Sequence, residues 1–234
     1  MSKSALSASP VQSRSHRAQS RSHRSECSPA GRVTRSLLGW GVVAGPFYIV
    51  VSLLEATLRP GFDLGRHSWS LMANGEFGWA HSAVLVITGL MVIAAAIGIG
   101  RALHVRTAAV LLAAFGAGQI GAGFFTADPA DGFPVGTPAG AGEITWHGLL
   151  HLVCGGLGFL AFTAATIVLG VRFLRHREPG WGVFSIATGV LFIAAFGGIA
   201  SGGAGPMVIA FIFAVVLAFA WLGLTCIRLY RRVS

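Results

Sequence analysis

The sequence predicts an all-α integral membrane protein, a bundle of six transmembrane helices with both termini in the cytoplasm. Three observations support this prediction. The composition is 54% hydrophobic and only 11% charged, six apolar stretches have membrane-spanning length, and basic residues are concentrated on one side. Soluble domains carry about 25% charged residues, so the composition alone indicates a membrane protein. The 33 glycines fit helices whose backbones approach closely inside a membrane.

Each apolar stretch reaches the roughly 20 residues that a helix needs to cross the hydrocarbon core of a bilayer. The helices are expected at residues 37–57, 79–100, 106–126, 146–171, 181–202 and 205–227. Two polar loops, 58–78 and 127–145, separate the first helix from the second and the third from the fourth. The other connections are short, so residues 37–234 are expected to form one transmembrane domain.

The distribution of charge predicts the orientation, because short cytoplasmic loops are enriched in Lys and Arg. Of the 17 basic residues, 15 lie on the side that holds both termini, and Arg59 and Arg66 lie on the other. Six of the eight acidic residues lie opposite the termini. Both termini are therefore predicted to be cytoplasmic. The dominance of Arg over Lys, with abundant Ala and Gly, indicates a GC-rich bacterial genome and hence the bacterial inner membrane.

Residues 1–36 differ from the rest of the chain. They are rich in Ser and Arg and contain Ser-Arg-Ser-His-Arg twice, at 13–17 and 20–24. The segment lacks the apolar core of a signal peptide and cannot bury enough apolar surface to fold. It is predicted to be a disordered cytoplasmic tail, either inert or held near anionic lipid headgroups. No nucleic-acid partner is expected, because no aromatic residues are interleaved with the charges.

The predicted outer side carries most of the unusual polar residues. Charged groups near membrane depth are costly and often mark ligand sites or pathways. The leading hypothesis is a non-enzymatic protein that binds or moves a small or lipid-like ligand through a pocket open to the outer face. The ligand-binding candidates are Arg59, Asp63, Ser68, His81, Asp128 and His147.

Two polar positions allow a structural and a functional interpretation. Glu55 precedes Arg59 by four residues, so on a continuing helix the two side chains would form an ion pair across one turn. Alternatively, both would join Asp63 and Arg66 in an outer vestibule for a polar ligand. Gln119, in a glycine-rich helix, is expected to bond a neighbouring helix, and the alternative is that it lines a cavity.

A metal site is the main alternative for the outer face. His147 and His151 are spaced i, i+4 on one helix face, a spacing that can chelate a metal ion. A catalytic zinc site needs a third ligand and an open position, and the candidates for the third ligand are His81 and Asp128 or Asp131. This arrangement would make the protein a metal-dependent membrane hydrolase, with Asp128 or Glu76 orienting or activating water. The simpler interpretation is that these histidines lie at the membrane interface.

Other functions are either excluded or less favoured. The chain contains no G-x-S-x-G, no phosphate-binding Walker loop, no dinucleotide fingerprint and no C-x-x-C motif. An accessory or assembly protein whose outer loops contact a partner is a second alternative. A haem held by two histidines is a more distant one.

The two outer loops carry a family resemblance. Asp63 followed by His67-Ser68-Trp69-Ser70-Leu71 makes up the first motif, and Phe125-Thr126-Ala127-Asp128-Pro129 with the later His147 makes up the second. These passages resemble the bacterial membrane proteins of domain of unknown function family 998, over about residues 40–230. The resemblance implies an integral membrane protein of about six helices with motif residues on the outer side. It implies no reaction.

A weaker similarity concerns the histidines alone. His81 with His147 and His151 is similar to the zinc site of seven-helix membrane hydrolases of the ceramidase and progestin/adiponectin-receptor type. Those proteins hold zinc with one His on an early helix and an H-x-x-x-H pair on a late one. This chain departs from the pattern in having six helices, a pair on the fourth, and no Ser-x-x-x-His before His81. The similarity is an analogy only.

Overall fold

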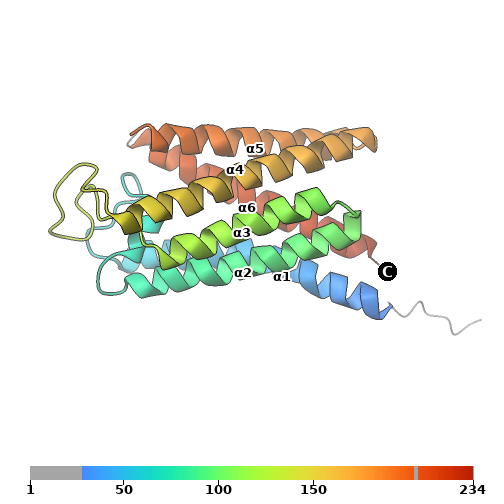
Figure 1. Cartoon of the computed structure of the whole chain (residues 1–234), viewed down its shortest axis with the longest axis horizontal. Helices are drawn as coiled ribbons and strands as arrows, with labels where there is room; N and C mark the ends of the chain where they lie inside the picture. The colour runs from blue at the N-terminus through green and yellow to red at the C-terminus, as the bar shows by residue number, and fades with distance from the viewer. Residues whose placement is uncertain (1–27, 203–204, 234) are drawn as a thin grey trace, which may run out of the picture.

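The computed structural model describes residues 28–202 and 205–233, and this part of the chain is all-α (Figure 1). A short 3₁₀ helix, η2 (Trp69–Ala73), lies in the loop after the first long helix. The long helices are α1 (Pro29–Leu58), α2 (Gly78–Leu103), α3 (Arg106–Phe124), α4 (Trp146–Arg175), α5 (Pro179–Ala200) and α6 (Pro206–Arg232).

Six helices within the described residues are long and apolar enough to cross a membrane. Even the shortest, α3 with 19 residues, spans about 28 Å at 1.5 Å per residue, close to the thickness of the hydrocarbon core. The six predicted helices are therefore confirmed. Most observed ends lie within about five residues of the predicted ones, and the largest difference is at the start of α1.

α1 begins eight residues inside the segment 1–36 that was predicted to be a disordered tail. The Ser28 side chain caps the new start, accepting a hydrogen bond from the Gly31 amide at 3.0 Å. The first turns of α1 also dock on α2, where Arg101 Nε donates to Thr34 Oγ1 at 2.9 Å. Capping and docking together stabilise turns that composition alone assigned to the tail. The rest of the predicted tail lies outside the described residues.

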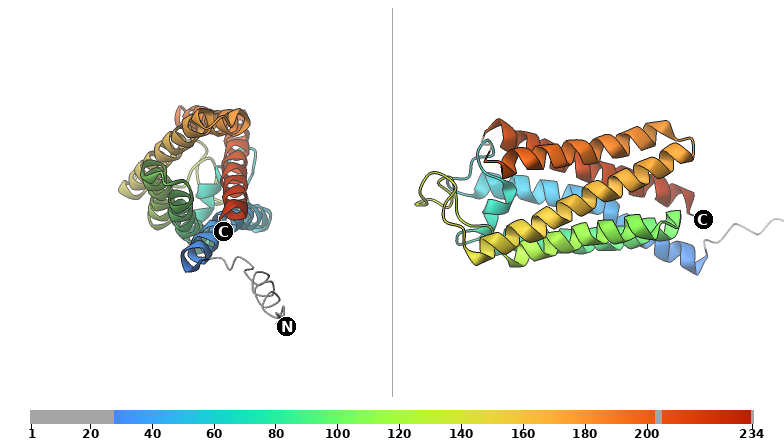
Figure 2. Two further views of the ribbon diagram at one scale, coloured as in Figure 1. Left: turned by 90° about the vertical axis from the view of Figure 1, so that its right-hand side faces the viewer. Right: turned by 45° about the horizontal axis from the view of Figure 1, so that its top comes forward.

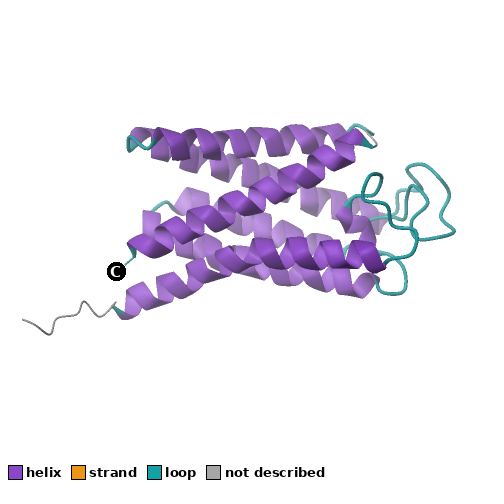
Figure 3. Cartoon of the chain, turned by 180° about the vertical axis from the view of Figure 1, so that it is seen from behind, coloured by secondary structure: helices purple, strands orange, loops and turns teal. Residues whose placement is uncertain are grey.

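The helices form a closed ring in which each packs against its neighbours in sequence, and α6 returns to pack against α1 (Figure 2). The loops after α1 and α3 gather at one end of the bundle (Figure 3). We call this the loop end. At the opposite end α1 begins and α6 ends (Figure 1), and it carries ten of the twelve arginines among the described residues. We call it the basic end.

Glycines bring α2, α3 and α4 close together. A Cβ at Gly89 would lie 2.5 Å from the carbonyl oxygen of Gly116, and a Cβ at Gly116 would lie 2.6 Å from that of Gly89. A Cβ at Gly118 would likewise lie 2.6 Å from the carbonyl oxygen of Cys154 on α4. Only glycine allows these backbone approaches. The close packing predicted for the glycine-rich α3 is thus confirmed.

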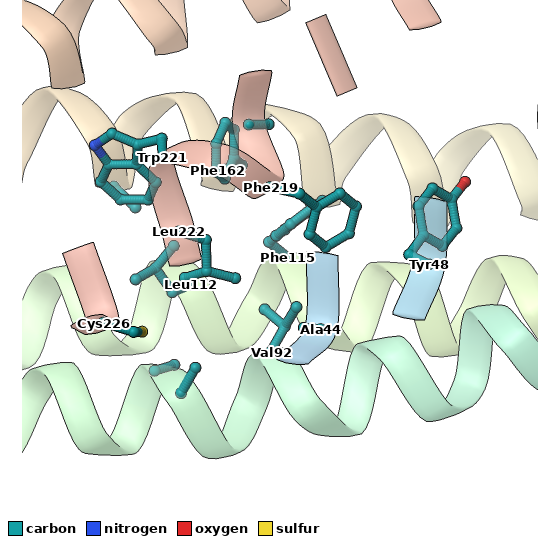
Figure 4. Packing of buried hydrophobic residues seen from close by; sticks show 14 of the residues in the cluster. Ala44, Tyr48, Val92, Leu112, Phe115, Phe162, Phe219, Trp221, Leu222 and Cys226 are labelled. Atoms are coloured by element: carbon teal, nitrogen blue, oxygen red, sulfur yellow. The ribbon is translucent and has the colours of Figure 1, made fainter. Parts of the chain in front are cut away.

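Aromatic side chains fill the middle of the ring (Figure 4). Phe162 packs against Trp221 with ring centroids 5.6 Å apart, and both side chains are almost fully buried. The indole Nε1 of Trp221 donates to Ser185 Oγ at 2.9 Å, so its polar edge is satisfied inside the core. Large exposed apolar side chains such as Leu157 and Phe213 lie on the outer surface of the helices, where lipid would cover them.

Candidate functional site

A short polar contact with a fully buried histidine joins α1 and α2 at the loop end. Glu55 Oε2, in the last turn of α1, lies 2.6 Å from His81 Nδ1, in the first turn of α2. The His81 side chain is fully buried and that of Glu55 is 14% exposed. A carboxylate is favoured at the N-terminal end of α2 by the helix dipole. The two residues form a buried acid–histidine pair.

The predicted ion pair between Glu55 and Arg59 does not form. α1 ends at Leu58, and Arg59 takes extended backbone angles (φ −89°, ψ 112°), so its side chain leaves the helix. Its Nη2 donates instead to the backbone carbonyls of Met72 and Asn74, the latter at 3.3 Å. Arg59 therefore ties the end of α1 to the end of η2. The prediction was wrong because it assumed that the helix continues past residue 58.

η2 covers the Glu55–His81 pair. A Cβ at Gly78, the first residue of α2, would lie 2.1 Å from the carbonyl oxygen of Ala73, so η2 contacts the start of α2 directly. Trp69 on η2 is 5% exposed and packs on Tyr48 with ring centroids 5.5 Å apart. Tyr48 in turn lies 6.3 Å from the His81 ring. Trp69 of η2 and Tyr48 of α1 thus pack next to the fully buried His81 side chain, and the pocket open to the outer face stays a prediction.

Several buried polar atoms at this junction have no hydrogen-bond partner among the described residues. They are His81 Nε2, Trp69 Nε1 and Ser52 Oγ. Ser52 precedes Glu55 by three residues, so both lie on the α1 face that packs toward α2. Buried polar groups are nearly always paired, and each exception calls for an explanation such as a ligand or a catalytic role. Three exceptions at one junction of α1, α2 and η2 identify it as the candidate site.

His67 joins the two outer loops. The backbone amide of Asp63 donates to His67 Nδ1 at 2.9 Å, and His67 Nε2 donates to the carbonyl of Asp131 at 3.0 Å. His67 is 2% exposed, and its ring packs against those of Phe62 and Phe133, which also contact each other. Both ring nitrogens are used, so His67 acts as a structural link between the loops.

The remaining candidates of the first loop are not assembled into a vestibule. The Asp63 carboxylate is exposed and accepts from the Gly65 amide at 2.7 Å, an arrangement typical of a turn. Ser68 Oγ lies 3.4 Å from Ser70 Oγ. Arg66 is exposed. The structure thus holds Asp63 and Ser68 in the loop, apart from the Glu55–His81 pair.

Asp128 organises the start of α4. Its Oδ2 accepts from the Thr145 amide at 2.8 Å and its Oδ1 from the Thr145 hydroxyl at 2.6 Å. Thr145 is the N-cap and accepts from the Gly148 amide at 3.3 Å. The carboxylate therefore lies at the positive end of the helix dipole, where it is favoured. Both oxygens are occupied by this capping arrangement.

The predicted metal ligands are not brought together. His147 is exposed and lies against Trp146, with ring centroids 3.5 Å apart. His151 is buried, and its Nδ1 donates to the carbonyls of Ala122 and Phe125 at 3.1 and 2.9 Å. Within the described residues, no three His, Cys, Asp or Glu side chains are grouped as metal ligands. His147 and His151 do lie one turn apart on α4, as the spacing predicted, but each contacts different neighbours.

Gln119 does not form the predicted bond to a neighbouring helix through its oxygen. The side chain is 8% exposed, and its Oε1 has no partner within the described part of the chain. The nearest atoms to Gly116 and Gly118 include backbone carbonyl oxygens, whereas Gly121 faces the Cys154 side chain.

Comparison with known proteins identifies the family. Residues 42–228 match the family described as "Protein of unknown function (DUF998)". The chain belongs to the DUF998 family. The predicted resemblance over about residues 40–230 is therefore confirmed. No curated protein and no solved structure matches the chain.

The DUF998 match contains every residue of the candidate site. It includes the Glu55–His81 pair, the η2 segment and both outer loops, and it leaves out the first turns of α1 and the last turn of α6. The family assignment supports a multi-pass membrane protein. It adds no reaction and no ligand.

Sequence reasoning identified His81 as a candidate but missed its partners. The sequence spacing paired Glu55 with Arg59 in a predicted ion pair. It gave no role to Tyr48, Ser52 or Trp69. One signal was available, because Tyr48, Ser52, Glu55 and Ala56 repeat at helical spacing on one face of α1. That face is buried in the structure apart from Glu55.

Proposed function

We propose that this DUF998 protein binds a small polar or lipid-like ligand at the loop end of its membrane domain, with the Glu55–His81 pair as the polar centre of the site. The observation that carries the proposal is the fully buried His81 ring. Its Nδ1 is held by Glu55 at 2.6 Å, while its Nε2 has no partner among the described residues. A ligand that bonds Nε2 would satisfy the most costly polar atom at this junction.

The chemistry of the pair defines what it can recognise. A carboxylate only accepts hydrogen bonds, so His81 Nδ1 donates to Glu55. In the neutral ring Nε2 is then an acceptor, suited to a hydroxyl or an amine of the ligand. In the protonated ring Nε2 donates and suits an acidic group.

Access to the site requires η2 to move. Trp69 and Met72 are 5% and 0% exposed, and Arg59 holds the end of η2 through two backbone carbonyls. In this proposal His81 contacts the ligand, and Arg59 positions the cover. The predicted ligand residues Asp63, Ser68, Asp128 and His147 serve loop structure or remain at the surface.

We further infer that the protein lies in a bacterial plasma membrane with its basic end in the cytoplasm and its loop end outside. The support is the charge asymmetry: Arg59 and Arg66 are the only arginines at the loop end within the described ranges. Cytoplasmic ends of short loops carry such an excess of arginine. The first 27 residues, for which contact with anionic headgroups was predicted, lie outside the described residues.

Mass spectrometry of molecules that co-purify with the protein tests the proposed site. The full chain and three variants, His81→Gln, Glu55→Gln and His147→Ala, are purified in a mild detergent and extracted with organic solvent. We expect one species at near-stoichiometric amount in the wild type and in His147→Ala, and its loss from the other two variants. His147→Ala is the matched control because that ring is exposed at the same end of the bundle.

Two outcomes would contradict the proposal. The same bound species in wild type and His81→Gln would show that the pair does not hold it. A stoichiometric second polypeptide, released by loop substitutions and not by His81→Gln, would favour the accessory or assembly function instead. Gel filtration and tryptophan fluorescence of each variant establish that the bundle is folded before the extracts are compared.

A further inference from the structure

A hollow of about 410 Å³ opens at the basic end, between the start of α5 and the last turns of α6. It lies at the other end of the bundle from the Glu55–His81 pair and does not depend on the function proposed above. Its lining is formed by aliphatic, aromatic and basic side chains, namely Trp181, Leu224, Ile227, Arg228, Arg231 and Arg232.

Arg228 is held rigidly in the wall of this hollow. Its guanidinium lies over the rings of Trp181 and Phe173, with Cζ 4.6 and 5.3 Å from the two centroids. Nη2 forms an ion pair with Glu178 Oε1 at 2.5 Å, while Nη1 is buried and has no partner among the described residues. The side chain is only 12% exposed. The Arg228 guanidinium therefore supplies a fixed positive charge in the wall of the hollow, with Nη2 already engaged by Glu178.

Among the described residues, the hollow has more positive charge than its one acidic neighbour, Glu178, can balance. Glu178 also receives Arg232, whose Nη1 and Nη2 lie 3.3 Å from the same carboxylate oxygen. Arg232 remains 57% exposed. Arg231 is exposed and forms no ion pair within the described ranges. Two guanidinium groups thus share one carboxylate and Arg231 adds a third positive charge, so the surplus favours an anionic ligand.

The apolar part of the lining points to the source of that anion. Leu224 is 48% exposed and precedes Arg228 by one helical turn, so the two lie on one face of α6. Trp181 is a residue type enriched at the membrane–water interface. A ligand in the hollow therefore meets guanidinium groups at the basic end and apolar side chains toward the membrane. A phospholipid has an anionic headgroup for the guanidinium groups and an acyl chain for the apolar side chains. Free phosphate has no apolar part that could contact those side chains.

We propose that the hollow between α5 and α6 binds the phosphate-bearing headgroup of an anionic phospholipid from the leaflet at the basic end. Arg231 and Arg232 contact the headgroup, Arg228 supplies a fixed guanidinium behind them, and Leu224 lies along the first part of an acyl chain. Basic pockets between transmembrane helices at the cytoplasmic side commonly take such headgroups.

Native mass spectrometry of the full chain in detergent tests this site. The probes are phosphatidylglycerol and phosphatidylcholine with the same acyl chains. The test variant is Arg231→Gln/Arg232→Gln, and the control variant is Arg106→Gln/Arg175→Gln. The control removes the same charge from exposed positions at the same end, outside the hollow. All four side chains are exposed, so neither variant is expected to disturb folding.

We expect the wild type and the control to bind one phosphatidylglycerol in preference to phosphatidylcholine. The test variant should bind it about thirtyfold more weakly, since each of its two lost guanidinium groups contributes about 1 kcal/mol near anionic lipid and about 1.4 kcal/mol is a factor of ten. Equal binding of both lipids, or equal losses in the test and control variants, would overturn the proposal. Displacement of phosphatidylglycerol by millimolar inorganic phosphate would also overturn it, since the site would then recognise free phosphate.

Discussion

The buried Glu55–His81 pair provides the sharpest test of the structure, through a double-mutant cycle with His81→Leu, Glu55→Leu and the double variant. His81→Leu leaves the Glu55 carboxylate, 14% exposed, without its donor. Truncating one partner of a buried pair costs about 3–5 kcal/mol. Because Glu55 keeps some exposure, we expect about 3 kcal/mol. Glu55→Leu leaves a neutral imidazole with an unsatisfied N–H, at about 2 kcal/mol.

The double variant removes both polar groups, so neither is left unpaired, and it should cost about 1 kcal/mol instead of the sum of about 5. The coupling is then about 4 kcal/mol. Hydrogen bonds between transmembrane helices average about 0.6 kcal/mol with a maximum near 1.7. A value above that range is expected here because the bond is short and its acceptor is charged.

Unfolding in mixed detergent micelles, followed by tryptophan fluorescence and far-ultraviolet circular dichroism, measures the four free energies. A parallel cycle between Glu55→Leu and His147→Leu is the control, since those side chains have no contact in the structure. The control should be additive within about 0.5 kcal/mol. The same additivity for Glu55 and His81 would refute the pair and, with it, the proposed site.

Three further substitutions test the elements around the site. Gly148→Ala places a Cβ 1.8 Å from Asp128 Oδ2, so the carboxylate must give up its two hydrogen bonds at the start of α4. Thermal unfolding should show that the free energy of unfolding falls by about 2 kcal/mol. An unchanged unfolding midpoint would contradict this cap. Arg59→Gln removes the link from α1 to η2, and hydrogen exchange should rise at least about tenfold in η2 and not in the membrane helices, for a loss of more than about 1.4 kcal/mol. Gly116→Ala forces α3 away from the carbonyl oxygen of Gly89, which lies 2.6 Å from the new Cβ. We expect about 2–3 kcal/mol of destabilisation in the same micelle assay, as for other overpacked interiors. A neutral result would mean that α2 and α3 lie farther apart than in this structure.

The transmembrane helices could be predicted from the sequence because the signal is local. Each one is a continuous apolar stretch that needs about 20 residues whatever it packs against. The glycine-rich faces of α3 could be recognised for the same reason, since small residues mark close helix contacts. The start of α1 could not be predicted in this way. Its first turns are polar by composition, and they are stabilised by the Ser28 cap and by Arg101 from α2.

The candidate site shows the opposite case. His81 stood out as a polar residue at a helix end, yet its partner Glu55 is 26 residues away on another helix. Spacing suggested that His147 and His151 share a ligand, and they do share a helix. One ring is exposed beside Trp146 and the other is buried on backbone carbonyls of α3 and the following loop.

The sequence by itself determined which segments cross a membrane, which end of the bundle carries the positive charge, and which family the chain belongs to. These properties depend on hydropathy, charge and local motifs, each of which can be read from neighbouring residues in the chain. Only the tertiary structure decided which polar atoms are paired. Pairing depends on where α1 ends, how η2 folds back on α2, and how the ring closes α6 onto α1, and each of these rests on contacts between residues far apart in the chain. Such contacts leave His81 Nε2 without a partner among the described residues and form the arginine-lined hollow at the basic end, and the two proposed binding sites rest on these features.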